Sequence, residues 1–459
     1  MRALDFGAVT AVHAVAPSAP TAHARQEGIP WGFAEFFLVS QTALPALLYL
    51  PGTQNFRLGI RFAAFAISLG AFAWWQLQSQ RVAPHRATNL VVAVLALLGI
   101  MLFHPTTTSL QGGLAHTMVY LAVLAPMFWA PHVVRSPEHL ARLLGLLLLC
   151  SGVNSLVGVL QVYDPDTWMP RELSRVVTEG ATGLGPVTYA GPGGRLIVRP
   201  PGLFDTPGAV AGPGMFAALL GVVFGLSAIP LWQRVGSFAL AAAGFAAIYL
   251  SQVRVTLVIV VAMFAAYAFV LFLQRRMAKA ITLGVFAGGI IALSFAVALT
   301  LGGDSILDRV MTLFADDPMA VYYKARGNQL DYTLNEMLFE FPLGAGLARW
   351  GMAAGYFAGQ GLPRIWAEIQ ITGWMIDGGI LMVALYGGAL IVNALHELRV
   401  ARRLELPRVA ACGAVVFAAN LGVAIMIITF TPFVTQIGIQ YWFLAGALHG
   451  VAIRQRVIT

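Results

Sequence analysis

The sequence predicts an all-α polytopic membrane protein with about twelve transmembrane helices. Hydrophobic residues make up 58% of the 459 residues and charged residues only 10%, whereas a soluble domain carries about 25% charged residues. The mean hydropathy is +0.77, and apolar runs of bilayer length recur along the whole chain. The bilayer, rather than a series of soluble domains, therefore sets the architecture.

Apolar runs near the ~20 residues that a bilayer core requires define the expected helices. Residues 1–30 lack an apolar segment before a small-residue cleavage motif, so we expect a cytoplasmic amino-terminal tail and no signal peptide. Five helices are expected within 31–162, four within 208–301, and three, with a cytoplasmic tail, within 374–459. The expected spans are 31–51, 59–77, 89–103, 113–130, 140–162, 208–228, 236–252, 255–274, 280–301, 374–395, 408–430 and 436–453.

The positive charge is almost all arginine, since Lys279 and Lys324 are the only lysines in a chain of net charge +8. Arginine concentrates in alternate short connections, which the positive-inside rule places in the cytoplasm together with both termini. A genomic preference for arginine codons would explain this composition, and so would bidentate recognition of phosphate. The positions of the arginines in the topology have to distinguish the two explanations. The basic connections contain Arg81, Arg86, Arg135, Arg142, Arg234, Arg275, Arg276, Arg399, Arg402, Arg403 and Arg408.

Two long connections, 163–207 and 302–373, fall on the opposite, periplasmic side of this topology. Their glycine, proline and charged residues indicate loops that contain short amphipathic helices. Residues 320–341 show apolar side chains at helical spacing and are expected to form one of these helices.

Arginines collect on this outer side, at Arg195, Arg199, Arg254 and Arg326. Arg254 lies in a turn of two or three residues between two apolar spans, and an ionisable group at the membrane boundary indicates a functional site. The alternative is an arginine that extends to the lipid headgroups. Arg199 precedes Pro-Pro-Gly, which restricts the backbone, although a loop salt bridge would also explain it. Asp205 at the start of the next span is typical of a helix cap.

Two arginines at the outer ends of different spans could clamp a diphosphate that lies at membrane depth. Polyprenyl diphosphate carriers place a diphosphate at this depth. No D-x-D pair in the outer loops, no metal-ligating cluster of His, Cys and carboxylates, and no nucleotide-binding glycine motif stand out in the sequence. We therefore expect no metal, no cofactor and no nucleic acid partner.

Three stretches resemble the O-antigen ligase and polymerase superfamily of membrane glycosyltransferases. Residues 199–208, R-P-P-G-L-F-D-T-P-G, look like the R-x-x-G-x-F-x-x-P-N element of that family. Residues 250–254, L-S-Q-V-R, look like its S-x-S-R turn. Arg326 followed by residues 342–347, P-L-G-A-G-L, looks like its large outer loop, and Asp377-Gly378 like its acidic-x-Gly entry into the next span. The resemblance covers roughly residues 140–400.

The resemblance implies a GT-C-like fold in the bacterial inner membrane, with an active site on the periplasmic face. It implies inverting, metal-independent transfer of a glycan from undecaprenyl diphosphate to a glycan or glycolipid acceptor. Arg199 and Arg254 would stabilise the departing diphosphate, with Arg326 and Arg195 as further binding residues. Glu368 stands where the ligase pattern has a histidine, and it is the candidate base, with Asp377 as the weaker one.

The absent histidine favours a Wzy-type polymerase, which adds a chain to the non-reducing end of a new lipid-linked repeat unit. The alternative is the ligase, which transfers a finished glycan to lipid A–core. A transporter of lipid-linked glycans is the alternative from another class. A transporter predicts internal repeats and charges near the membrane centre, and the sequence shows no repeat.

Overall fold

The structure, a computed structural model, describes residues 32–50, 52–78, 82–170, 188–190, 194, 196–204, 206–315, 322–357 and 363–457. The predicted amino-terminal tail, Arg195 and Asp205 lie outside these residues.

Eight helical segments within the described ranges are long and apolar enough to cross a membrane. Phe33–Tyr49 (α1, Phe33–Ala43, and η1, Leu44–Tyr49), α3 (Thr88–Met101) and α9 (Ala211–Gly225) are shorter apolar helices. The eight are α2 (Arg57–Gln76), α4 with α5 (Leu110–Leu124 and Pro126–Val133), α6 (Pro137–Tyr163), α10 (Leu231–Ser251), α11 (Arg254–Leu273), α12 (Met277–Gly302), α18 (Gln370–Ala401), and α19 with η7 (Pro407–Ile425 and Met426–Ile428).

Each of the twelve predicted spans overlaps one of these helices or α20 (Gln436–Arg454). The structure thus confirms a mainly helical chain with several candidate membrane spans. The count of twelve crossings stays a prediction, because four of the helices are too short or too polar by the criteria that the other eight meet.

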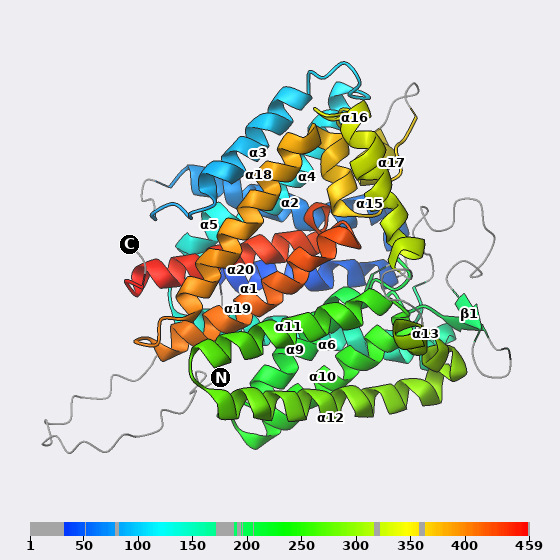
Figure 1. The fold of residues 1–459 in the computed structure, drawn as a ribbon, viewed down its shortest axis with the longest axis vertical. Coiled ribbons are helices and arrows are strands. Elements are labelled where there is room, and N and C mark those ends of the chain that lie inside the picture. The colour runs from blue at the N-terminus through cyan, green and yellow to red at the C-terminus, as the bar shows by residue number, and fades with distance from the viewer. Residues whose placement is uncertain are drawn as a thin grey trace, which may run out of the picture.

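The helices form one bundle in which α19 is central and α12 peripheral (Figure 1). The most apolar stretch of α19 is 72% buried, whereas that of α12 is only 17% buried. Helix α19 packs between α11 and α18 and also contacts α20, while α6, α9 and α10 pack against one another. Helix α19 is therefore largely enclosed by protein, whereas most of the apolar surface of α12 is exposed.

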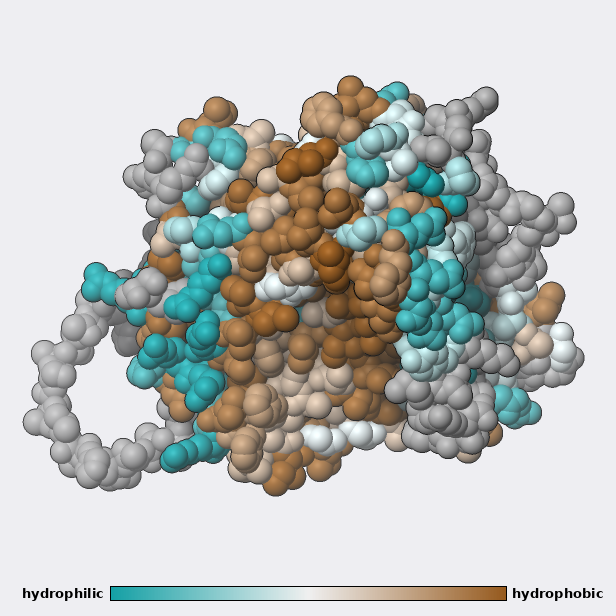
Figure 2. All heavy atoms as spheres, turned by 45° about the horizontal axis from the view of Figure 1, so that its top comes forward, coloured by the Kyte–Doolittle hydropathy of each residue, from teal (hydrophilic) through white to brown (hydrophobic). Residues whose placement is uncertain are grey.

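A broad hydrophobic band lies between two hydrophilic edges on the face seen in Figure 2. On α12, Ile281, Val285 and Leu293 are each more than 60% exposed. Contiguous apolar surface of this extent is unusual for a soluble monomer. The surface therefore agrees with a membrane protein whose polar ends are the two edges of the band.

The long connections gather at one end of the bundle, and the carboxyl terminus lies at the other (Figure 1). The first connection contains the antiparallel pair β1 (Thr188–Ala190) and β2 (Leu196–Val198), with Tyr189 opposite Ile197. The second begins with α13 (Asp304–Ala315) and includes α17 (Gly351–Phe357). Short elements α7 (Pro165–Trp168), η2 (Thr53–Phe56) and η8 (Pro432–Val434) complete the connections.

The predicted helix is confirmed over its described part, from Tyr322 to Glu340. It consists of η5 (Tyr323–Gly327), α15 (Asn328–Tyr332), η6 (Thr333–Met337) and α16 (Leu338–Glu340). Both η5 and η6 are π-helical turns, a rare geometry that is frequent at functional sites.

Candidate functional site

The Arg199-Pro-Pro-Gly202 turn is fixed by buried amide side chains of α6. Gly202 has a positive φ of +66°, and a Cβ there would lie 2.0 Å from Asn154 Oδ1. Its N–H donates to Gln161 Oε1 at 2.9 Å, and its carbonyl accepts from Gln161 Nε2 at 2.8 Å and from the Tyr49 hydroxyl. Asn154 and Gln161 are almost fully buried. The backbone beside Arg199 is thereby held in one position on the bundle.

The Arg199 side chain reaches the turn between α10 and α11. Its Nε donates to the carbonyl of Ser251 at 3.2 Å, and Ser251 is the last residue of α10. Gln252 has a left-handed φ of +57°, which reverses the chain so tightly that α11 begins at Arg254. The predicted short turn is confirmed, and the structure places Arg199 and the segment that carries Arg254 side by side.

Gly208 leaves room for Arg199 at this point. A Cβ on Gly208 would lie 3.3 Å from Arg199 Nη2 and 3.5 Å from the Ser251 carbonyl, and φ is +71°. We expect Gly208→Ala to displace the guanidinium and to lower activity roughly tenfold to a hundredfold, because small misplacements of a positioning group have effects of this size. The measurement is the rate, with purified protein, of the glycan transfer that the sequence leads us to expect.

Gly194→Ala is the matched control for Gly208→Ala. Gly194 also has a positive φ, +76°, but nothing lies within 4 Å of its Cβ position. The Gly194→Ala substitution introduces the same type of backbone strain, of about 1–2 kcal/mol, without the contact to Arg199. Equal losses of activity in the two variants would show that strain, and not the position of Arg199, is responsible.

Arg326 brings a second guanidinium to the same region. It lies in η5 and forms an ion pair with Glu368, with 39% of the Arg326 side chain and 28% of the Glu368 side chain exposed. Burial lowers the pKa of both Arg199 and Arg326, and repulsion from the positive charge of Arg199 lowers the pKa of Arg326 further. The fold thus holds two like charges close enough to repel each other, which an anion between them would relieve.

Three contacts orient Glu368 within the second long connection. Its carboxylate pairs with Arg326 and accepts a hydrogen bond from Trp366 Nε1 at 2.9 Å, and its N–H donates to Gln329 Oε1 at 2.7 Å. A buried hydrogen bond of 2.6 Å between the hydroxyls of Thr333 and Thr372 fastens the helical segment that contains Arg326 and Gln329 to α18. The carboxylate is therefore positioned, and it stays partly accessible.

Asp377 is not the alternative base that the sequence suggested. It is fully buried inside α18, and its two oxygens face three donors: His116 Nε2 at 3.0 Å, the Tyr120 hydroxyl at 2.7 Å and Trp350 Nε1 at 2.9 Å. A carboxylate with three protein partners and no exposure cannot reach a substrate hydroxyl. Asp377 is a positioning residue that joins α4, α18 and the Trp350 segment.

Two of the sequence motifs meet beside Asp377. The N–H of Ala345 donates to the Ile376 carbonyl at 2.7 Å, and the N–H of Ile380 donates to the Pro342 carbonyl at 3.1 Å. These bonds are possible because Gly378 and Gly379 interrupt the helical geometry of α18. The P-L-G-A-G-L loop and the Asp-Gly-Gly entry into α18 form one unit.

The structure therefore brings Arg199, Arg326 and Glu368 together and puts Arg254 on the adjoining turn. Arg195 and Asp205 lie outside the described residues. Sequence reasoning missed Asn154 and Gln161, although two amides seven residues apart on one face of an apolar span are a usable signal.

No protein-family model and no curated protein matches this chain. Two guanidinium groups and a partly exposed carboxylate, at the polar edge of an apolar bundle, can bind a diphosphate and orient a hydroxyl. In the part of the chain that the structure describes, the only group of three potential metal ligands contains none of these residues.

Proposed function

We propose that the protein is a membrane glycosyltransferase, a polysaccharide polymerase of the Wzy type. It transfers a glycan chain from undecaprenyl diphosphate to the non-reducing end of a lipid-linked repeat unit, which makes an O-antigen or exopolysaccharide. The observation that carries the proposal is the approach of Arg199 to Arg326, two partly buried like charges beside Glu368. The ordered motifs that resemble the ligase and polymerase superfamily support it.

The reaction forms one bond and breaks one. A sugar hydroxyl of the acceptor attacks the anomeric carbon of the donor, and the bond from that carbon to the diphosphate oxygen breaks. The diphosphate leaves with the electron pair, and Arg199, Arg254 and Arg326 stabilise its growing negative charge by preorganised electrostatics. The hydroxyl proton passes to the Glu368 carboxylate.

The ion pair between Arg326 and Glu368 gives this scheme an order of events. When the donor arrives, Arg326 exchanges the carboxylate for the diphosphate, which carries more negative charge. Glu368 then loses its cationic partner and gains the capacity to accept a proton. Donor binding thus frees the Glu368 carboxylate to act as the base. Without the donor, Glu368 stays paired with Arg326.

A transporter is the second candidate, because α18 contains a fully buried carboxylate. Glu397 accepts hydrogen bonds from Asn393 Nδ2 at 2.9 Å and Asn420 Nδ2 at 2.6 Å. An ionisable side chain buried within a candidate membrane-spanning helix is typical of transport pathways. The ligase is the third, but the glutamate at the histidine position favours the polymerase.

The test is glycan formation in a null strain that expresses Arg254→Ala or Glu368→Gln, with membrane levels of each variant measured. We expect both variants to be present, to make no long polymer, and to accumulate single lipid-linked repeats on the outer face of the membrane. Accumulation on the cytoplasmic face would instead support transport, and long polymer left on its carrier would support the ligase. Full activity of both variants would overturn the site.

A further inference from the structure

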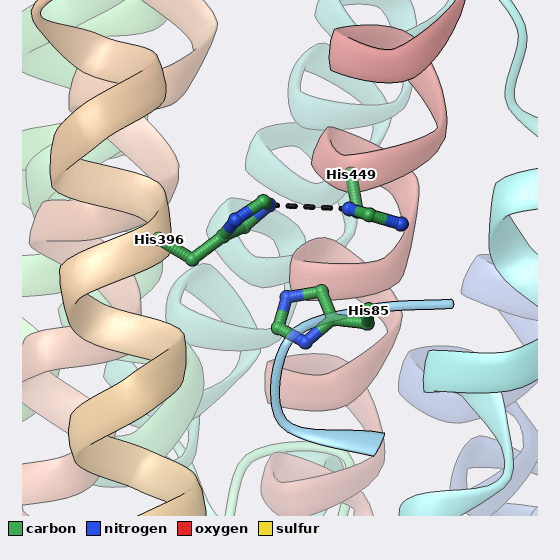
Figure 3. A group of neighbouring side chains, drawn as sticks. All are labelled: His85, His396 and His449. Atoms are coloured by element: carbon green, nitrogen blue, oxygen red, sulfur yellow. Dashed lines mark hydrogen bonds between the residues drawn. The ribbon is translucent and has the colours of Figure 1, made fainter. Parts of the chain in front are cut away.

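Three histidines from distant parts of the chain meet inside the bundle (Figure 3). His85 belongs to the connection between α2 and α3, His396 to α18, and His449 to α20. Their exposed fractions are 4%, 0% and 2%, and one ring nitrogen from each lies within 4.8 Å of those of the other two. This arrangement is not used in the glycosyl transfer proposed above.

The cluster lies at the opposite end of the molecule from Glu368. Glu368 precedes α18, and His396 lies near the far end of that helix. At 1.5 Å per residue, the regular part of α18 from Ile380 to His396 alone spans roughly 24 Å. Any ligand of the histidines is therefore separate from the diphosphate site.

His449 has the arrangement of a metal-ligating histidine. Its Nε2 lies 2.9 Å from the carbonyl of Ala83, so Nε2 carries the proton and Nδ1 keeps its lone pair. That Nδ1 lies 3.2 Å from His396 Nε2. A backbone carbonyl that fixes the other ring nitrogen is the usual outer partner of a metal-bound imidazole.

His85 directs its remaining nitrogen toward the other two rings. Its Nδ1 accepts a hydrogen bond from the N–H of Ala87 at 3.1 Å, and its buried Nε2 has no hydrogen-bond partner. Figure 3 shows one nitrogen of this ring facing His396 and His449. A neutral imidazole whose nitrogen has no other partner is the form that binds a metal.

The spacing of the nitrogens suits a tetrahedral ion. Zn–N distances of 2.0–2.1 Å at tetrahedral angles separate two ligand nitrogens by about 3.3 Å. The two nitrogens of His396 and His449 are 3.2 Å apart already. Three imidazoles leave a fourth position for a water molecule. Binding moves the protons of His85 and His396 from Nε2 to Nδ1 of the same ring, so the Ala87 amide gives up its acceptor and the connection adjusts locally.

The charges nearby restrict the choice of ion. Arg86 acts electrostatically on all three rings, and Arg399 acts on His396, whereas the ligand group contains no carboxylate. Hard ions such as Mg²⁺ and Ca²⁺ depend on oxygen ligands and negative charge, which this cluster lacks. Transition-metal ions bind neutral imidazole and tolerate this field better.

We propose that His85, His396 and His449 bind a divalent transition-metal ion such as Zn²⁺. The ion fastens the connection between α2 and α3 to α18 and α20. Three histidines with a water are the ligand set of catalytic zinc sites, but the nearly complete burial of the rings keeps substrate from this ion and assigns it a structural role.

The test measures bound metal in the full-length protein, purified in detergent with an affinity tag that contains no histidine. The protein is stripped with EDTA, exposed to Zn²⁺ and desalted, and zinc is counted by mass spectrometry. We expect about one zinc ion per chain, an increase in the thermal midpoint with Zn²⁺ but not with Mg²⁺, and a tetrahedral absorption spectrum with Co²⁺. Protein that takes up no zinc overturns the proposal whatever the variants do.

Two variants and one control assign the ligands. His85→Gln and His396→Gln should each lose most of the zinc and the zinc-dependent increase in midpoint. His104→Gln is the control, because His104 contacts Thr106 in a different connection and should keep both. Equal zinc in wild type and His85→Gln, or equal loss in His104→Gln, would contradict the assignment.

Discussion

Arg199→Ala is expected to lower the rate of the proposed glycan transfer by about 10²–10³-fold, the effect of removing one preorganised donor from a developing negative charge. The side chain is held between the Ser251 carbonyl and the surface of Gly208, so it needs little rearrangement to meet the diphosphate. The measurement is the rate of chain extension by purified protein with lipid-linked repeats at saturating donor.

Folding should survive this change, since Arg199 is one of two mutually repelling cations. Arg199→Lys keeps the charge but loses the bidentate geometry and should recover only part of the rate. Arg364→Ala is the control, because Arg364 is an exposed arginine of the second outer connection and should retain the wild-type rate. Similar losses in Arg199→Ala and Arg364→Ala would show that the effect is one of general surface charge.

The parts of the fold that local patterns determine could be predicted from the sequence. Apolar runs identified the positions of the membrane helices, and the polar Ser251–Arg254 segment between two of them identified a short turn. The helix that contains Arg326 followed from its apolar spacing. These features depend on residues within one or two turns of each other, which is the range that periodicity reports.

Contacts between distant segments could not be predicted in this way. Nothing in the spacing of Arg199 and Arg326 places them together, and only a resemblance to a family suggested it. Asp377 was read as a possible base because the sequence shows its neighbours along the chain but not His116 or Tyr120. The histidine cluster was missed for the same reason. His85, His396 and His449 lie in three separate segments, so no metal-ligand spacing is visible along the chain.

Burial also changed the meaning of individual residues. Asn154 and Gln161 look like tolerated polar residues in an apolar run, yet they provide the hydrogen bonds that fix the Gly202 turn. A polar group in a dry interior needs a partner. Polar residues inside predicted spans are therefore better indicators of tertiary contacts than the loop residues that they support.

Asp377→Ala is expected to lower the free energy of unfolding by about 3–5 kcal/mol, the cost of removing one partner from a buried charged network. The change leaves donors of His116, Tyr120 and Trp350 buried without an acceptor. It also loosens the attachment of the Pro342–Leu347 loop to α18, so activity should fall with stability. The measurement is denaturant unfolding of the purified protein in detergent.

Two comparisons separate this network from a general effect of charge. Asp377→Asn keeps one acceptor oxygen and should be less destabilising than Asp377→Ala, while Glu340→Gln, at an exposed position, should have no measurable effect. Because Trp350 donates to the same carboxylate, Trp350→Phe in the Asp377→Ala background should cost less than Trp350→Phe alone. Additive losses would mean that the two side chains act independently and that the carboxylate is not the centre that joins α4, α18 and the outer loop.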